Sequence, residues 1–161
     1  MRLLALLFIA FFLSQVGQGL ASSKCYTIDE AEAEQGIRIH SELMVIGLNC
    51  QHKSYVYSNR NLYTQYREFT SKHVGLFAGY EEKLISFFRE NGDSDPEARL
   101  NTMRTKFANK ISNDSARMRP DVFCQRYAPR ITKVAHMNRE DLRKWATTFF
   151  PSHPVSRPLC K

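Results

Sequence analysis

The stretch from Thr27 to Cys50 constrains the fold more than any other part of the chain, because it has the pattern of one long helix with a cysteine just before its start and another at its end. Thr27 and Glu30 stand three residues apart, as in a capping box that satisfies backbone N–H groups at a helix start. Negative side chains near that start favour the positive end of the helix dipole: Asp29, Glu30, Glu32 and Glu34. Residues recurring every three or four positions predict one buried helical face: Ala33, Ile37, His40, Met44 and Gly47, widened by Leu43 and Ile46.

The length of this helix decides which cysteines can pair. The four cysteines, Cys25, Cys50, Cys124 and Cys160, allow three pairings. A helix of residues 27–48 is about 33 Å long, whereas disulfide-bonded Cα atoms lie at most about 7 Å apart, so Cys25 cannot reach Cys50. Short connections make consecutive helices antiparallel, which returns Cys124 to the end where Cys50 lies and carries Cys160 toward Cys25. The sequence therefore predicts the disulfides Cys50–Cys124 and Cys25–Cys160.

The first residues have the composition of a secretory signal peptide. One basic residue precedes a short apolar run, residues 3–13, and Gly19-Leu20-Ala21 has the small-x-small pattern of a signal peptidase site. We expect cleavage after Ala21, which assigns residues 1–21 to the signal peptide and residues 22–161 to a single helical domain. The apolar run is shorter than the roughly 17 to 25 residues that span a bilayer, so no transmembrane span is expected after cleavage. The expected location is periplasmic or extracellular, where an even number of cysteines is typical of disulfides.

The second predicted helix, residues 61–91, carries the strongest apolar periodicity in the sequence. Gly75 and Gly79 each weaken its middle by about 1 kcal/mol relative to alanine, and we expect a bend or break at one of them. The residues in steps of three and four are Leu62, Tyr66, Phe69, His73, Leu76, Tyr80, Leu84 and Phe87 or Phe88.

Proline and cap residues delimit the remaining helices. Asp95-Pro96 supplies an N-cap and a proline at the first position of a third helix that runs to about residue 116. Pro120 opens a fourth helix, which Pro129 breaks or kinks, and Asn138 caps a fifth. Residues 151–161 hold three prolines and predict an extended tail. The fold class is therefore all-α, an up-down bundle of about four to five helices stapled by two disulfides, with an extended C-terminal tail.

Charge is unevenly distributed along the chain, which has 23 basic and 16 acidic side chains. Carboxylates prevail before residue 98 and basic side chains after it, a pattern that indicates either attraction between the two halves or an anionic partner. On the third helix four cations align on one face, and we call them the basic stripe: Arg99, Lys106, Lys110 and Arg117. Arg104, Arg139, Arg143 and Lys144 could extend it.

The basic stripe is a candidate anion-binding surface. Polyanions, anionic lipid head groups or cell-envelope glycans would suit it, while a solvated face or pairing with the acidic first helix would explain the same residues without a ligand. Nucleic acid fits poorly, because the chain is expected to be exported and there is no aromatic stacking pattern among these charges. Asn113 begins a glycosylation triplet, which matters only in a host that glycosylates its exported proteins.

Catalytic and metal-binding motifs are missing from the sequence. His40 and His73 fall on the apolar faces of neighbouring helices and could hold a metal between them, but no carboxylate accompanies them at helical spacing, which favours two core histidines bonded to polar neighbours. We assign no catalytic residue, metal or cofactor.

The sequence thus predicts a non-enzymatic exported helical protein that binds a protein partner or an anionic cell-envelope component. Two alternatives stay open: a small enzyme or metal-binding bundle that uses His40 and His73, and a structural or stress-protective envelope protein. The pattern of residues does not identify the partner or the oligomeric state.

Overall fold

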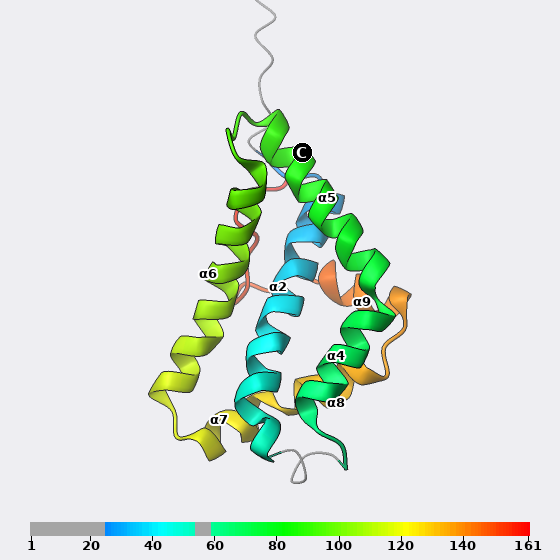
Figure 1. Ribbon diagram of the computed structural model, residues 1–161. Coiled ribbons are helices and arrows are strands. Elements are labelled where there is room, and N and C mark those ends of the chain that lie inside the picture. The colour runs from blue at the N-terminus through cyan, green and yellow to red at the C-terminus, as the bar shows by residue number, and fades with distance from the viewer. Residues whose placement is uncertain (1–24, 54–58) are drawn as a thin grey trace, which may run out of the picture.

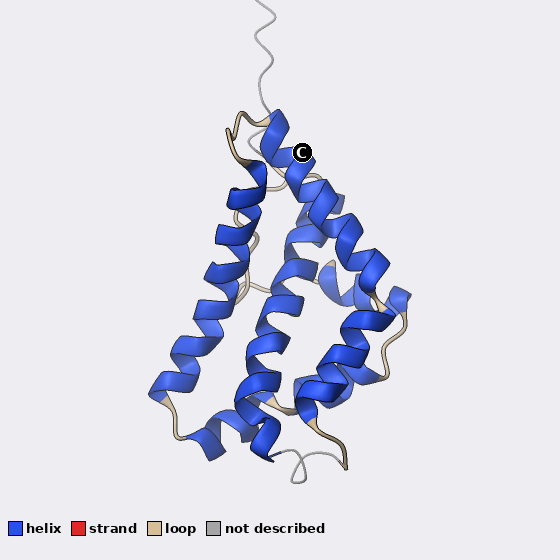
Figure 2. Ribbon diagram, in the orientation of Figure 1, coloured by secondary structure: helices blue, strands red, loops and turns tan. Residues whose placement is uncertain are grey.

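The computed structural model describes residues 25–53 and 59–161, which form an all-α fold around one central helix (Figure 1). Over these residues the chain consists of helices and loops without a strand (Figure 2). The central helix is α2 (Ile28–Cys50), and it contacts each of the other described α-helices. They are α4 (Leu62–Lys72), α5 (Val74–Glu90), α6 (Pro96–Arg117), α7 (Pro120–Tyr127), α8 (Pro129–Ala135) and α9 (Arg139–Ala146), and a single turn of 3-10 helix, η1 (Gln51–Lys53), follows α2. The all-α prediction is confirmed, while the predicted signal peptide at residues 1–21 lies outside the described residues.

Helix α2 begins as the sequence predicts. The Thr27 hydroxyl accepts a hydrogen bond from the Glu30 backbone N–H, and the Glu30 carboxylate accepts one from the Thr27 backbone N–H, so both halves of the capping box are present. This arrangement satisfies two N–H groups that a helix start otherwise leaves unpaired.

The predicted apolar face of α2 is buried, with His40 and Met44 half-buried, but the helix is also buried on nearly every other side. Neighbouring helices cover it from several directions, and its buried residues include polar and charged ones: Glu32, Glu34, Gln35, Arg38, Ser41 and Glu42. A helix surrounded on all sides has no solvent face on which to place these groups, so each needs a partner inside the protein. Glu32 and Glu34, expected to act on the helix dipole, are among these buried residues.

The predicted second helix is divided into α4 and α5, but the break falls at His73 and not at a glycine. His73 ends α4 and begins α5 with a φ of −111° and a ψ of 16°, outside the helical range. Gly75 and Gly79 lie inside α5 on its exposed side, where the chain continues as helix. The imidazole of His73 is buried and bonds the Met137 carbonyl oxygen at 3.3 Å, which fixes the chain at this point. The predicted apolar periodicity is confirmed, since its residues are buried along both helices.

Caps and prolines delimit the later helices as predicted. The Asp95 carboxylate accepts a hydrogen bond from the Ala98 N–H, with Pro96 at the first position of α6. Pro129 separates α7 from α8, because a proline inside a helix removes one backbone hydrogen bond. Asn138 forms a second capping box, with Asp141, at the start of α9.

Both predicted disulfides are present. Cys50 is bonded to Cys124 with their Cα atoms 5.5 Å apart, and Cys25 is bonded to Cys160 with their Cα atoms 5.0 Å apart. The first bridge joins the end of α2 to α7 and is fully buried, while the second joins the segment before α2 to the tail. The disulfide pairing predicted from the length of the first helix and the up-down direction of the helices is therefore confirmed.

The C-terminal tail, residues 151–161, has no helix and runs back along α2 toward its start. The Tyr26 backbone N–H donates to the Pro158 carbonyl at 2.8 Å, and the Cys160 N–H donates to the Tyr26 carbonyl at 2.8 Å, forming one parallel bridge. This places the tail beside the first turns of α2. Among the residues that the structure describes, no helix has both the length and the apolar character needed to cross a membrane.

Candidate functional site

The basic stripe lies on α6 with all four of its side chains exposed. None of the four forms an ion pair with a carboxylate among the described residues. Pairing of the stripe with the acidic first helix, which would have explained these charges within the fold, is therefore not seen over this part of the chain. Over the described residues the four charges therefore form no direct ion pair, although the charge of Lys110 acts on the Glu42 carboxylate of α2 at longer range.

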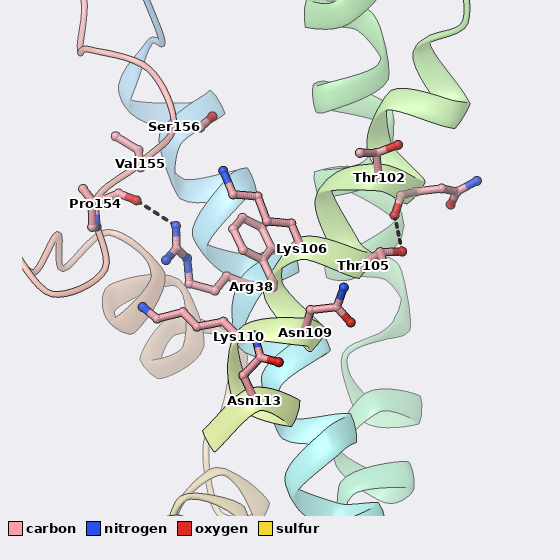
Figure 3. Close-up of a pocket in the computed structure, with 12 residues that line it drawn as sticks. Arg38, Thr102, Thr105, Lys106, Asn109, Lys110, Asn113, Pro154, Val155 and Ser156 are labelled. Carbon is pink, nitrogen blue, oxygen red and sulfur yellow. Dashed lines mark hydrogen bonds between the residues drawn. The ribbon is translucent and has the colours of Figure 1, made fainter. Parts of the chain in front are cut away.

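Two of the four, Lys106 and Lys110, line a groove between α6 and the tail, which we call the α6–tail groove (Figure 3). The groove has a volume of about 920 Å³. Lys106 and Lys110 extend from α6 toward the tail, and Arg38 points from α2 toward Pro154 (Figure 3). Arg99 and Arg117 are not among its lining residues. The structure thus divides the predicted stripe into a pair at the groove and a pair outside it.

The rest of the groove wall consists of uncharged hydrogen-bonding groups and a few apolar atoms. No carboxylate is found among the described residues that line it. The polar members are Asn101, Thr102, Thr105, Asn109, Asn113 and Ser156, and the apolar members are Phe107, Pro154 and Val155. Amides and hydroxyls can both donate and accept hydrogen bonds, so the groove offers many such groups beside three positive charges. Asn113, the possible glycosylation site, is exposed on this wall.

Arg38 forms the base of the groove and is held in place by three contacts. One terminal nitrogen donates to the Pro154 carbonyl oxygen at 2.7 Å and lies 3.5 Å from a carboxylate oxygen of Glu34. The guanidinium also lies over the Phe107 ring, 4.4 Å from its centroid. Burial lowers the pKa of Arg38, and the neighbouring carboxylates of Glu34 and Glu42 oppose that shift. The residue stays a cation, since the ordinary arginine pKa lies far above neutral pH.

Arg38 belongs to a row of buried polar residues on α2 that holds the tail. The Gln35 side-chain amide donates to the His153 carbonyl at 2.8 Å. The Glu34 carboxylate accepts hydrogen bonds from both the backbone N–H and the hydroxyl of Ser156. Side chains of α2 thus form hydrogen bonds with backbone groups of the tail. These bonds hold the tail beside α2, where it forms one wall of the groove. Sequence reasoning missed this row, although Glu34, Arg38 and Glu42 recur every four residues and could have been noticed as a polar stripe.

Other charges of the basic half do pair with the acidic half. The Arg143 guanidinium donates two hydrogen bonds to the buried Glu32 carboxylate, at 2.7 and 2.9 Å, and the Tyr80 hydroxyl donates a third at 2.7 Å. Burial alone would raise the pKa of Glu32, but the hydrogen bonds from Arg143 and Tyr80 outweigh burial and hold that pKa below its ordinary value. Arg104 on α6 forms an ion pair with Glu81 on α5, and both of these side chains are partly exposed. Attraction between the acidic N-terminal half and the basic C-terminal half thus accounts for some of the basic residues after residue 98, but not for the four residues of the basic stripe.

The two histidines considered for a metal site each bond a different neighbour. The Nε2 of His40 lies 3.3 Å from the Tyr66 hydroxyl, and its ring packs edge-on against Phe77. The Nε2 of His73 is 3.3 Å from the Met137 carbonyl, and its ring packs against Phe69. Over residues 25–53 and 59–161, no group of three or more His, Cys, Asp or Glu side chains could hold a metal ion. These contacts are those of core histidines bonded to polar neighbours.

The environment of His40 leads to a prediction about pH. Burial, reinforced by the nearby Arg104, lowers the pKa of His40 below 6.5, so in mildly acidic solution the unfolded chain binds a proton that the folded chain does not. Linkage then requires the free energy of unfolding to fall as the pH drops below about 6.5. We expect His40→Gln to reduce this pH dependence, as measured by urea unfolding at several pH values. An identical slope in the variant would contradict the prediction.

A comparison of the chain with known protein families, with curated proteins and with solved structures finds no match. Since all four cysteines are bonded, none is available as a nucleophile. The α6–tail groove is the place where the predicted binding residues and a concave surface coincide.

Proposed function

We propose that this protein is a non-catalytic binding protein of the cell envelope, which holds an anionic polymer in the α6–tail groove. The observation that carries the proposal is the composition of the groove: three cations, Arg38, Lys106 and Lys110, stand beside amides and hydroxyls, with no carboxylate among its described lining residues. A cleft lined by charges of one sign concentrates ligands of the opposite sign.

The groove suits a hydroxyl-rich chain with negative charges better than a flat lipid surface. Its depth places Arg38 below the exposed lysines, so a ligand must enter the groove to contact all three. The amide and hydroxyl groups along the wall can bond sugar hydroxyls in either direction. Two disulfides support an exported protein, because such bonds persist in oxidising compartments. An anionic envelope glycan is therefore the proposed ligand class.

The stripe offers a matched pair of variants for testing the proposal. We expect Lys106→Gln with Lys110→Gln to weaken binding to dextran sulfate about tenfold, equivalent to about 1.4 kcal/mol. Arg99→Gln with Arg117→Gln removes the same charge from the same helix outside the groove, and it should change the affinity about twofold or less. Neutral dextran is the control ligand, and binding should weaken as salt is added because the attraction is electrostatic. Isothermal titration calorimetry measures both affinities.

Three outcomes would refute the groove as the binding site. Equal weakening by both variant pairs would show that net charge alone attracts the polymer. No weakening by the lysine pair would show that the polymer binds elsewhere. Equal affinity for vesicles of phosphatidylglycerol, abolished by either pair, would assign the stripe to a membrane surface instead.

A further inference from the structure

The two disulfides differ in their access to solvent. The inner bridge, Cys50–Cys124, joins two cysteines that are fully buried. In the outer bridge, Cys25–Cys160, Cys160 is exposed and Cys25 is only half-buried. A thiol must reach a sulfur atom before it can exchange with a disulfide. The outer bridge is therefore open to reduction in the folded protein, whereas the inner bridge is covered.

The tail that the outer bridge fastens contributes little to the hydrophobic core. None of residues 151–161, all of which the structure describes, is fully buried. Val155 is the apolar side chain of the tail that packs against the core, and the Arg157 guanidinium lies over the Phe87 ring. Each hydrogen bond of the tail replaces one to water and adds little net stability, while ordering each residue costs conformational entropy. The covalent bridge is therefore the main restraint on the end of the tail.

The tail also hides a carboxylate from the α6–tail groove. The Glu34 side chain on α2 is 0% exposed, and its oxygens accept hydrogen bonds from the backbone N–H and the hydroxyl of Ser156. One of these oxygens lies 3.5 Å from a terminal nitrogen of Arg38, the most buried cation of the groove. Departure of the tail uncovers this negative charge beside Arg38, where it would repel an anion.

Two of the three groove cations are held by the tail backbone. The Pro154 carbonyl accepts a hydrogen bond from Arg38 at 2.7 Å (Figure 3), and the Ser152 carbonyl accepts one from the Nζ of Lys110 at 3.2 Å. Residues 154–156 also form the wall of the groove opposite α6. Without the tail, the two cations lose these acceptors and the groove loses its concave shape.

We propose that the outer bridge is a redox-sensitive latch of the groove, which a dithiol reductant opens. The proposal rests on the proposed function and names how the same site is controlled. A thiolate of the reductant attacks the Sγ of Cys160, which forms a mixed disulfide and releases Cys25 as a thiolate. The second thiolate of the reductant then breaks the mixed disulfide. Two electrons thus pass to the protein, both cysteines take up protons, and the reductant becomes a disulfide. The freed tail leaves α2 while the inner bridge keeps the helices joined.

The experiment treats the unmodified protein with increasing dithiothreitol. Alkylation and peptide mass mapping should find the outer bridge reduced at concentrations that leave the inner bridge intact. Hydrogen exchange should then accelerate at the backbone N–H groups of Ser156 and Cys160, which donate to Glu34 and to the Tyr26 carbonyl. Circular dichroism should show unchanged helix content. Affinity for dextran sulfate should fall about tenfold.

A variant reproduces the open latch without a reductant. We expect Cys25→Ser with Cys160→Ser to bind dextran sulfate about tenfold more weakly than the unmodified protein and to respond to dithiothreitol by about twofold or less. Oxidised dithiothreitol carries no thiol and is the control additive, which should leave the affinity of the unmodified protein unchanged.

Reduction of both bridges at the same concentration would overturn the proposal. So would a reduced outer bridge with tail N–H groups still protected, or with an affinity within about twofold of the oxidised protein. These outcomes are read on the unmodified protein, so the test stands even if the serine variant does not fold. Failure of the proposed function gives a different result: the oxidised protein does not bind dextran sulfate, while reduction still exposes the tail N–H groups to exchange. That result would refute the proposed function and support release of the tail.

Discussion

Replacement of Cys50 and Cys124 by alanine is expected to lower the free energy of unfolding by about 4 to 5 kcal/mol. The bridge closes a loop with a sequence separation of 74 residues, and its removal returns that loop's conformational freedom to the unfolded chain. Both cysteines are fully buried, so the alanines also leave a small cavity where the sulfur atoms packed. Such a loss is comparable to the whole stability of many domains. Urea unfolding of both proteins under non-reducing conditions measures it.

The second disulfide is the control for this prediction. Cys25–Cys160 closes a longer loop, with a separation of 135 residues, so loop entropy alone would give it the larger effect. Once it is removed, however, the tail can leave α2 while the helices stay packed, and this new freedom of the folded state offsets part of the entropy that the unfolded chain gains. We therefore expect Cys25→Ala with Cys160→Ala to cost less than the Cys50 pair. A larger loss for the tail bridge would show that the tail and the helices unfold as one unit.

Replacement of Gly36 by alanine is expected to cost about 3 to 5 kcal/mol. A Cβ atom at this position would lie 2.2 Å from Cε2 and 2.3 Å from Cδ2 of the Tyr80 ring, far inside van der Waals contact. Tyr80 is 4% exposed and its hydroxyl donates to the buried Glu32 carboxylate, so the ring cannot move without breaking that bond. The clash therefore separates α2 from α5 or costs a charged hydrogen bond. The midpoint and slope of urea unfolding give the change.

Gly79→Ala is the matched control for Gly36→Ala. Nothing lies within 4 Å of a Cβ atom built at Gly79, and the residue lies on the exposed side of α5. Alanine favours a helix over glycine by about 1 kcal/mol, so this variant should be more stable than the parent. If both substitutions destabilise the protein equally, the close approach of Gly36 and Tyr80 is not the cause.

Local signals in the sequence were sufficient to predict the helices and the disulfides. The capping pairs at Thr27 and Asn138 and the prolines at 96, 120 and 129 act through adjacent backbone, so their effect is visible in a short stretch of residues. The disulfide pairing followed from the length of the first helix and from the antiparallel direction of consecutive helices. The break at His73 was missed because its anchor, the Met137 carbonyl, is distant in sequence.

The candidate site was predicted only in part, since it depends on which helix face meets the tail. The spacing of the basic stripe predicts four cations on one face of α6, and all four are exposed, but the spacing could not divide Lys106 and Lys110 from Arg99 and Arg117. That division depends on where the tail lies, which is decided by the partners Glu34, Gln35 and Arg38 on α2. A search for apolar periodicity passes over these polar residues.

The two disulfides are nested, because Cys50–Cys124 lies wholly inside the loop that Cys25–Cys160 closes. During oxidation of a chain that emerges from its N-terminus, Cys25 and Cys50 are the first two thiols to meet an oxidant, and their bond would be the wrong one. Once formed, α2 prevents this error by holding the two cysteines at opposite ends of a helix of about 35 Å. The inner bond can then form when α7 arrives, and the outer bond must wait for Cys160. The length of α2 thus excludes the one pairing that the order of the cysteines along the chain would otherwise favour.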